Sequence, residues 1–146
     1  MARIEDSGDI SLAEFINNHP EFNDLPILDL EVFQDLRLSI DDDLMFSDLV
    51  TIYLNSAETL IDEIQIALNN QDVGKFSISC HSLKSTSASI GARKLSYLCK
   101  FLEKTSKTGG FNNISIGYFY LIIKEYDQAI AKIQTNVISF MSSPPL

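Results

Sequence analysis

The sequence predicts an all-α fold, an antiparallel up-down four-helix bundle preceded by one or two short N-terminal helices. Apolar residues recur every three or four positions along four long segments, which is the period of an amphipathic helix. The breaks between those segments are short and contain Asn, Asp or Gly. Short connections between long helices favour antiparallel neighbours, and 146 residues suffice to bury one core.

We expect residues 1–27 to form an acidic, partly ordered extension. An apolar cluster within it predicts a short helix over about 11–18, with Ser11 as its N-terminal cap. Pro20 favours extended geometry at the preceding residue, His19. Because no cluster of metal-ligating residues lies near His19 in the sequence, we interpret it as a solvated loop residue and not as a ligand.

A helix is predicted over about 30–39, and three successive carboxylates, Asp41–Asp43, follow it. They lack the alternating ligands and the glycine of a calcium loop. They precede a long helix, over about 44–69, and negative charge there favours the positive end of the helix dipole. We therefore interpret them as capping residues and not as metal ligands.

The next helix is expected to be capped by Asp72 and to contain His81. Gly91 is expected to end or kink it by adopting a left-handed conformation. A further helix covers about 92–107, and Gly109 and Gly110 stop it.

The last long helix is predicted over about 115–140. Its start, 118–123, taken alone is also compatible with a strand, but helical spacing resumes beyond it. The bundle would then cover residues 28–141, and 142–146 would form a flexible tail. Met1 and the complete final helix favour a free-standing protein over a piece of a larger kinase.

The residues around His81 combine an imidazole, an ammonium group and small side chains. Lys84, Ser85, Ser77 and Ala88 lie three, four or seven residues from it, so all five share one patch of helix surface. A neutral imidazole has a ring nitrogen able to attack phosphorus, and a nearby ammonium group can pair with an anion. A single histidine beside an apolar stripe is, however, more often structural or merely exposed.

The run from His81 to Ala92 resembles the histidine phosphotransfer (HPt) family, through His81, Leu83, Lys84, Ser87 and the sequence Ile90-Gly91-Ala92. Leu95, Cys99, Leu102 and Glu103 continue the likeness. Members of that family pass a phosphoryl group between the aspartates of receiver domains, or onward from the receiver of a hybrid kinase. The family usually has glycine four residues after the histidine, where this chain has Ser85.

The resemblance implies that His81 is the phosphorylated nucleophile and that Lys84 pairs with the phosphoryl oxygens. Ser85 would be a small neighbour able to donate a hydrogen bond, while Ser77, Ala88 and Lys75 would belong to the face that docks the receiver. Gly91 would have a structural role. The resemblance also implies that Mg²⁺ and the acidic pocket belong to the partner, with no intrinsic cofactor or metal site, and no carboxylate lies near His81 in the sequence.

The expected partners are response-regulator receiver domains and a hybrid sensor histidine kinase, bound by a monomer. No nucleotide-binding motif is visible, so the phosphoryl group must come from another protein, and the chain itself would lack kinase and ATPase activity. The alternative is a non-catalytic helical interaction module that docks a receiver without carrying phosphate. A degenerate HPt-like domain, suggested by Ser85 alone, is a third hypothesis.

The net charge of −9 is unevenly distributed. Residues 75–107 contain seven Lys or Arg against one acid, Glu103, a net charge of +6, whereas the rest of the chain carries −15. This basic band would attract an acidic partner and stabilise a phosphoryl group. A basic hairpin packed beside an acidic one is an equally good and compatible interpretation. The acidic total, without basic residues interleaved with aromatics, argues against nucleic-acid binding.

Composition also bounds the location of the chain. No apolar run approaches the roughly 20 residues needed to span a bilayer, and residues 1–6 lack the apolar core of a secretory signal. Cys80 and Cys99 have no metal-like or redox spacing and are interpreted as reduced core thiols. Cys80 is adjacent to His81, but neighbours on a helix point in different directions, so a thiol–imidazole pair is not expected. We therefore expect a cytoplasmic location, with nuclear access if the source is eukaryotic.

Overall fold

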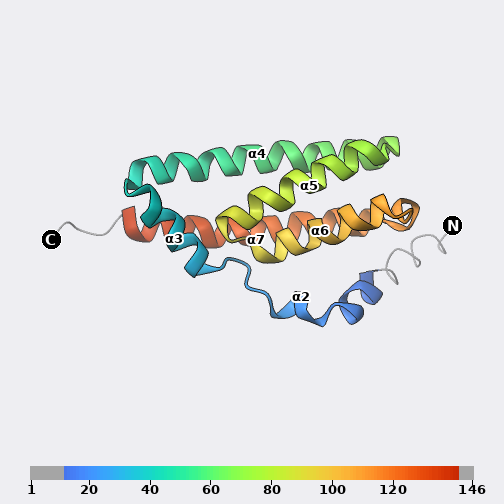
Figure 1. Cartoon of the computed structure of the whole chain (residues 1–146), viewed down its shortest axis with the longest axis horizontal. Coiled ribbons are helices and arrows are strands. Elements are labelled where there is room, and N and C mark those ends of the chain that lie inside the picture. The colour runs from blue at the N-terminus through green and yellow to red at the C-terminus, as the bar shows by residue number, and fades with distance from the viewer. Residues whose placement is uncertain (1–11, 142–146) are drawn as a thin grey trace.

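The computed structural model of the chain describes residues 12–141. Four long helices, α4 to α7, lie side by side and form the bundle, with shorter helical segments before them (Figure 1). In chain order the elements of the described range are helical residues 12–18, α2 (Pro20–Asp24), α3 (Leu30–Ile40), α4 (Asp43–Asn70), α5 (Val73–Ile90), α6 (Arg93–Lys107), the 3₁₀ turn η1 (Phe111–Asn113) and α7 (Ile116–Met141). The predicted all-α bundle is confirmed, and residues 118–123 are helical. None of the described helices is long and apolar enough to cross a membrane.

Aspartates cap the N-termini of α4 and α5, as the sequence predicted. The Asp42 side chain accepts a hydrogen bond from the backbone N–H of Met45, at 3.0 Å, and caps α4. Asp72 caps α5 in the same way through the N–H of Lys75, also at 3.0 Å. Such bonds satisfy N–H groups that have no partner within the first helical turn. The interpretation of the aspartate run as capping residues is thus confirmed at Asp42.

The turn between α5 and α6 depends on Gly91. Its φ of +96° is the left-handed conformation expected at a helix end. The Gly91 carbonyl accepts a hydrogen bond of 2.7 Å from the N–H of Asp29, just before α3. A Cβ at Gly91 would lie 2.8 Å from the Asp29 carbonyl oxygen. The left-handed conformation lets α6 fold back along α5, the helix that carries His81, and the close approach ties this turn to the segment before α3.

The inner faces of α4 to α7 form one apolar core, to which α3 contributes Phe33. Hydrogen bonds connect α4 to α5 and to α7 within this core. Tyr53 of α4 hydrogen-bonds with Ser87 of α5, at 2.9 Å between their oxygens, and the Tyr126 hydroxyl donates to the Leu54 carbonyl at 3.0 Å. Cys80 and Cys99 are free thiols buried in this core, as expected. Packing of their inner faces therefore holds α5 and α6 in place and leaves their outer faces exposed.

The N-terminal part differs from expectation in two ways. Three short helical segments precede the bundle where one or two were predicted, because Pro20 sits in the first turn of an additional helix, α2. His19 is a loop residue as predicted, in the break between helical residues 12–18 and α2, but it is half-buried and not solvated. Its ring stacks on Phe15, 4.7 Å between centroids, and its Nδ1 donates to the Phe15 carbonyl at 2.9 Å.

Phe15 and Phe22 of this part are buried against the bundle, each with 2% of its surface exposed. The described portion of the predicted N-terminal extension, from residue 12 onward, therefore contributes to the core. Ser11 and the predicted flexible tail, 142–146, lie outside the described residues. The division into extension, bundle and tail remains a prediction.

Substituting Gly91 by Ala is expected to lower the free energy of unfolding by about 2–3 kcal/mol, because the new Cβ meets a backbone oxygen as well as an unfavourable φ. Gly109→Ala is the matched control, since Gly109 also has positive φ, +88°, but a Cβ there meets nothing within 4 Å. It should cost about 1 kcal/mol. Urea unfolding of both variants measures the difference, and equal losses would contradict the proposed clash.

Candidate functional site

His81 lies midway along α5 and is exposed, with 57% of its side-chain surface accessible. The residue before it, Cys80, and the residue two after it, Leu83, point into the core. Position 81 therefore lies at the edge of the buried stripe, where the ring stands between solvent and the neighbouring helix α6. This is the placement that the sequence predicted.

Glu103 of α6 is the centre of the site. Its Oε2 accepts a hydrogen bond from His81 Nδ1 at 2.9 Å and another from Lys107 Nζ at 2.8 Å. Its Oε1 accepts from Lys84 Nζ at 2.7 Å. One carboxylate thus accepts three charge-assisted hydrogen bonds, two from α5 and one from its own helix.

The environment keeps Glu103 ionised. Only 8% of its side-chain surface is exposed, and burial by itself raises the pKa of a carboxyl. The hydrogen bonds from Lys107, Lys84 and His81 outweigh that burial and lower the pKa of Glu103 to about 2. The side chain is therefore negatively charged at any physiological pH.

The charge of Glu103 also determines which ring nitrogen of His81 carries the proton. An ionised carboxylate only accepts hydrogen bonds, so Nδ1 must be the donor. In the neutral ring the lone pair then resides on Nε2, on the far side of the ring from Glu103. A buried acid that orients a histidine through Nδ1 prepares the opposite nitrogen as a base or nucleophile.

The structure brings together some of the predicted site residues and separates others. Lys84 lies one helical turn after His81 and shares its carboxylate partner. Ser85 and Ala88 are exposed on the same side of α5 and line a groove beside Lys84. Lys75 is exposed in the first turn of α5, six residues before His81.

Ser77 is not on the exposed face, which corrects its assignment to the docking surface. It is 6% exposed and lies 3.0 Å from Ser106 of α6, oxygen to oxygen. Because the Ser106 hydroxyl donates to the Glu103 carbonyl at 2.8 Å, the Ser77 hydroxyl donates to Ser106. Helical spacing puts Ser77 on the His81 side of α5, but α6 packs over that position. Its role is to hold the two helices together beside Glu103.

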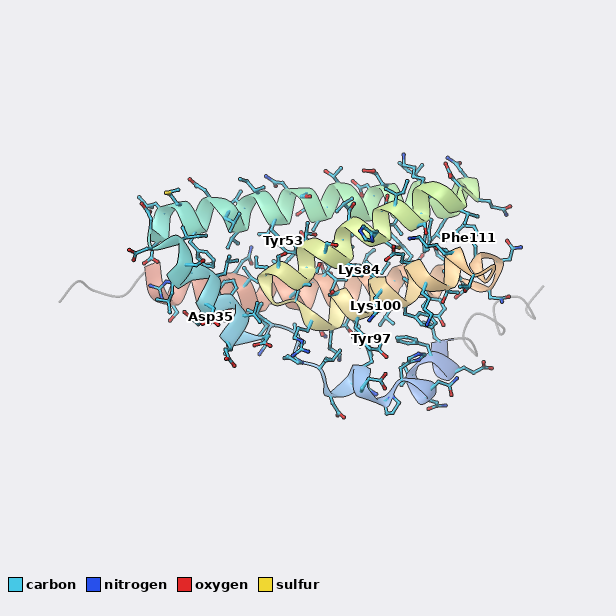
Figure 2. The ribbon with its side chains drawn as sticks, in the orientation of Figure 1. Asp35, Tyr53, Lys84, Tyr97, Lys100 and Phe111 are labelled. Atoms are coloured by element: carbon cyan, nitrogen blue, oxygen red, sulfur yellow. The ribbon has the colours of Figure 1, made fainter. Side chains whose placement is uncertain are left out.

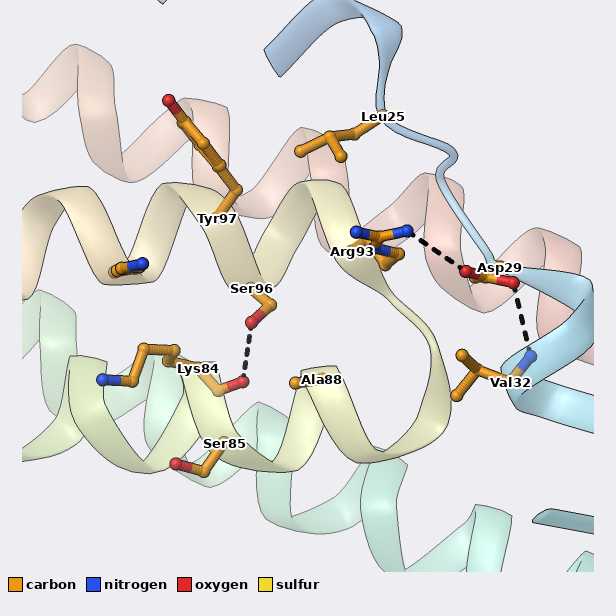
Figure 3. Close-up of a pocket in the computed structure, with 10 residues that line it drawn as sticks. Leu25, Asp29, Val32, Lys84, Ser85, Ala88, Arg93, Ser96 and Tyr97 are labelled. Carbon is orange, nitrogen blue, oxygen red and sulfur yellow. Dashed lines mark hydrogen bonds and ion pairs between the residues drawn. The ribbon is translucent and has the colours of Figure 1, made fainter. Parts of the chain in front are cut away.

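A groove of about 540 Å³ adjoins the site (Figure 3), and its charged lining residues are Lys84, Arg93, Lys100 and one acid, Asp29, which pairs with Arg93. Lys84, Ser85 and Ala88 form one wall, and Arg93, Ser96 and Lys100 of α6 form the facing wall. The Ser96 hydroxyl donates to the Lys84 carbonyl at 2.9 Å, which fixes the backbone under the lysine. Lys84 and Lys100 lie on the same side of the α5–α6 hairpin (Figure 2). The basic band predicted from the charge distribution therefore continues away from His81 along this groove.

Two residues of the site, Glu103 and Lys107, received no role from the sequence. Glu103 is 22 residues from His81, and only the antiparallel packing of α6 on α5 brings the two together. The sequence could have identified Glu103, because it is the single acid between Lys75 and Lys107. Lys107, four residues further on, follows from Glu103 as a neighbour on the same helix face.

Two curated proteins are similar to this chain in sequence. Phosphorelay intermediate protein YPD1 of Candida albicans is 27% identical over 97 residues, which cover 66% of this chain and 53% of that protein. Multistep phosphorelay regulator 1 of Schizosaccharomyces pombe is 37% identical over 82 residues, 55% of this chain and 28% of the relative. The chain thus spans about half or less of the length of these curated relatives.

The fold also has a close counterpart among solved structures. Histidine-containing phosphotransfer protein B of Pseudomonas aeruginosa superimposes with a TM-score of 0.71 at 21% identity, over 77% of this chain and 95% of that one. At that identity the likeness concerns the fold. The family model described as the Hpt domain matches residues 48–131, which is α4 almost from its start, all of α5 and α6, and part of α7. Since this match covers more than half of the sequence and includes His81 with its whole carboxylate network, the chain belongs to the Hpt domain family.

Proposed function

We propose that this chain is a phosphorelay intermediate, which accepts a phosphoryl group on His81 from one receiver-domain aspartate and passes it to another. The observation that carries this proposal is the exposed imidazole whose Nδ1 is bound by the buried, ionised Glu103. That arrangement presents Nε2 to a partner. The names of the two curated relatives, a phosphorelay intermediate and a multistep phosphorelay regulator, support the same role.

The reaction is an in-line displacement at phosphorus. The Nε2 lone pair forms an N–P bond while the acyl P–O bond of the donor's aspartyl phosphate breaks, and the donor carboxylate leaves with the electron pair. Nδ1 keeps its proton throughout, and Glu103 stabilises the positive charge that develops on the ring. In onward transfer the N–P bond breaks, its electrons return to Nε2, and an acceptor aspartate forms the new P–O bond.

Positioning and charge neutralisation are the main requirements of such a transfer. Lys84 lies one turn from His81, where its ammonium group can reach a phosphoryl group on the ring. The exposed positions Ser85 and Ala88 carry small side chains, which leave room for the loops of a partner. We expect Mg²⁺ and the acidic pocket that holds it to come from the receiver domain.

The face that would receive the partner combines apolar and basic groups. Ile78, three residues before His81, is 70% exposed, and Ile52 of the adjacent helix α4 is 63% exposed. Ile52 lines an apolar groove of about 360 Å³ between α3, α4 and α5. Together with Lys75 and Lys84, these residues give a surface suited to an acidic active site surrounded by apolar side chains.

The last part of the proposal concerns the partner kinase, the oligomeric state and the cellular location. A hybrid sensor histidine kinase would supply the first receiver, and the chain would act as a monomer in the cytoplasm, with access to the nucleus in a eukaryote. Two buried, unpaired thiols suit such a reducing compartment. No described feature favours a module that docks a receiver without carrying phosphate.

The central prediction is transfer of label to His81. Incubation with a ³²P-phosphorylated receiver domain and Mg²⁺ should move label to this chain in an acid-labile, alkali-stable form, as expected for a phosphorus–nitrogen bond. His81→Gln should reduce labelling to background while binding of the receiver persists. Binding without any acid-labile label on the unmodified chain would instead identify a non-catalytic docking module.

A second prediction concerns the docking face. Ile78→Ser should weaken receiver binding by about tenfold, because removing a large apolar side chain from the centre of an interface costs about 1–2 kcal/mol. Ile138→Ser of α7 is the matched control, since Ile138 is 62% exposed on a helix that does not carry the histidine. Titration calorimetry with one receiver domain compares the two, and equal affinities would remove Ile78 from the interface.

A further inference from the structure

The site contains two ammonium groups, which is more positive charge than the unphosphorylated His81 needs. Lys84 and Lys107 both donate to Glu103, at 2.7 and 2.8 Å, and come from different helices. Lys84 is 26% exposed and Lys107 is 60% exposed, whereas the carboxylate between them is 8% exposed. Two solvent-accessible ammonium groups are therefore held by one buried anion beside the reactive ring.

We propose that Glu103 is a positioning residue that binds both lysines while His81 is unphosphorylated. Phosphorylation of His81 then draws the lysines from this carboxylate to the phosphoryl oxygens. Lys107 is then a second phosphoryl-binding residue, supplied by α6. This inference rests on the function proposed above. It adds a regulatory element within the same site, namely competition between a fixed carboxylate and a transient phosphoryl group for the same two cations.

Geometry makes the exchange feasible without any rearrangement of the helices. The Oε2 atom of Glu103 binds both His81 Nδ1 and Lys107 Nζ, so this ammonium group and the ring share one carboxylate oxygen. A lysine side chain has four rotatable carbon–carbon bonds and three N–H donors, which lets it turn from one oxygen to another or bridge two. Glu103 itself is buried and cannot follow the lysines outward.

The charges at the site explain why the lysines would move and why they would bind the phosphoryl group only weakly. A phosphoryl group adds nearly two negative charges at a site that holds one carboxylate and two ammonium groups. It is the stronger partner for the lysines, but each lysine that moves leaves Glu103 with less compensation in a buried position. The phosphoryl group is therefore bound less tightly than it would be by two uncommitted lysines. A weakly held phosphoryl group is readily passed onward, as a relay intermediate requires.

A purely structural role for Glu103 would have different consequences. If the carboxylate only joined α5 to α6, its replacement would lower the free energy of unfolding and leave the energetics of the phosphorylated state unchanged. The distinguishing quantity is the equilibrium distribution of label between His81 and a receiver aspartate. This distribution reports the free-energy difference between the phosphorylated and the unphosphorylated site, and the protein is folded in both states.

The test is Glu103→Gln in the full chain, equilibrated with a phosphorylated receiver domain and Mg²⁺. The glutamine oxygen can still accept from Nδ1, but it lacks the charge that retains the lysines. The ratio of label on His81 to label on the receiver should rise about fivefold, since an ion pair with partial exposure contributes about 1 kcal/mol. The ¹⁵N spectrum of the ring should show that Nδ1 keeps its proton. An unchanged or lower ratio would overturn the inference.

Lys107→Met provides an independent test at a side chain that is 60% exposed. It removes one phosphoryl partner, so the same ratio should fall about threefold, opposite in sign to the effect of the glutamine variant. Lys104→Met is the matched control, because Lys104 is an exposed lysine of the same helix without a described contact to Glu103, and it should leave the ratio unchanged. Equal effects at 104 and 107 would indicate general electrostatics and refute a specific exchange. If the unmodified chain takes no label, the proposed function itself fails and this inference fails with it.

Discussion

One buried carboxylate, that of Glu103, connects the fold of this protein to its chemistry. Removing a charge from water is costly, and the structure offsets that cost with hydrogen bonds from His81, Lys84 and Lys107. The bonds from His81 and Lys84 also link α5 to α6, and the bond from His81 sets the proton on Nδ1 of the imidazole. The orientation of the reactive ring and the local charge balance thus depend on a single side chain, which also contributes to the attachment of the two helices.

The α5–α6 hairpin provides the rigidity that this arrangement needs. At one end Gly91 turns the chain in a conformation that a side chain would obstruct, and along the hairpin two hydroxyl contacts tie the helices together. Ser96 holds the backbone of Lys84, and Ser77 with Ser106 supports the backbone of Glu103. A site built on packed helices keeps its donors and acceptors within a few tenths of an ångström, which loops rarely achieve.

Local features of the sequence were sufficient to predict most of the fold. The long helices were located to within one or two residues, because apolar periodicity, the capping aspartates 42 and 72, and Gly91 all act over a few neighbouring residues. The prediction was poorer before the bundle. There the Pro20-initiated helix α2 and the stacking of His19 on Phe15 depend on aromatic contacts with α6, as between Phe15 and Phe101. Such contacts leave no periodic signal in a short segment.

The same division applies to the candidate site. The sequence by itself determined that His81 and Lys84 share one exposed helix face, since residues three apart on a helix are neighbours whatever surrounds them. Only the tertiary structure decided that Ser77 is covered, that Glu103 binds the ring, and that Lys107 shares the oxygen of Glu103 that binds it. Those outcomes depend on the side of α5 against which α6 packs, a choice made by the whole core and by no local run of residues.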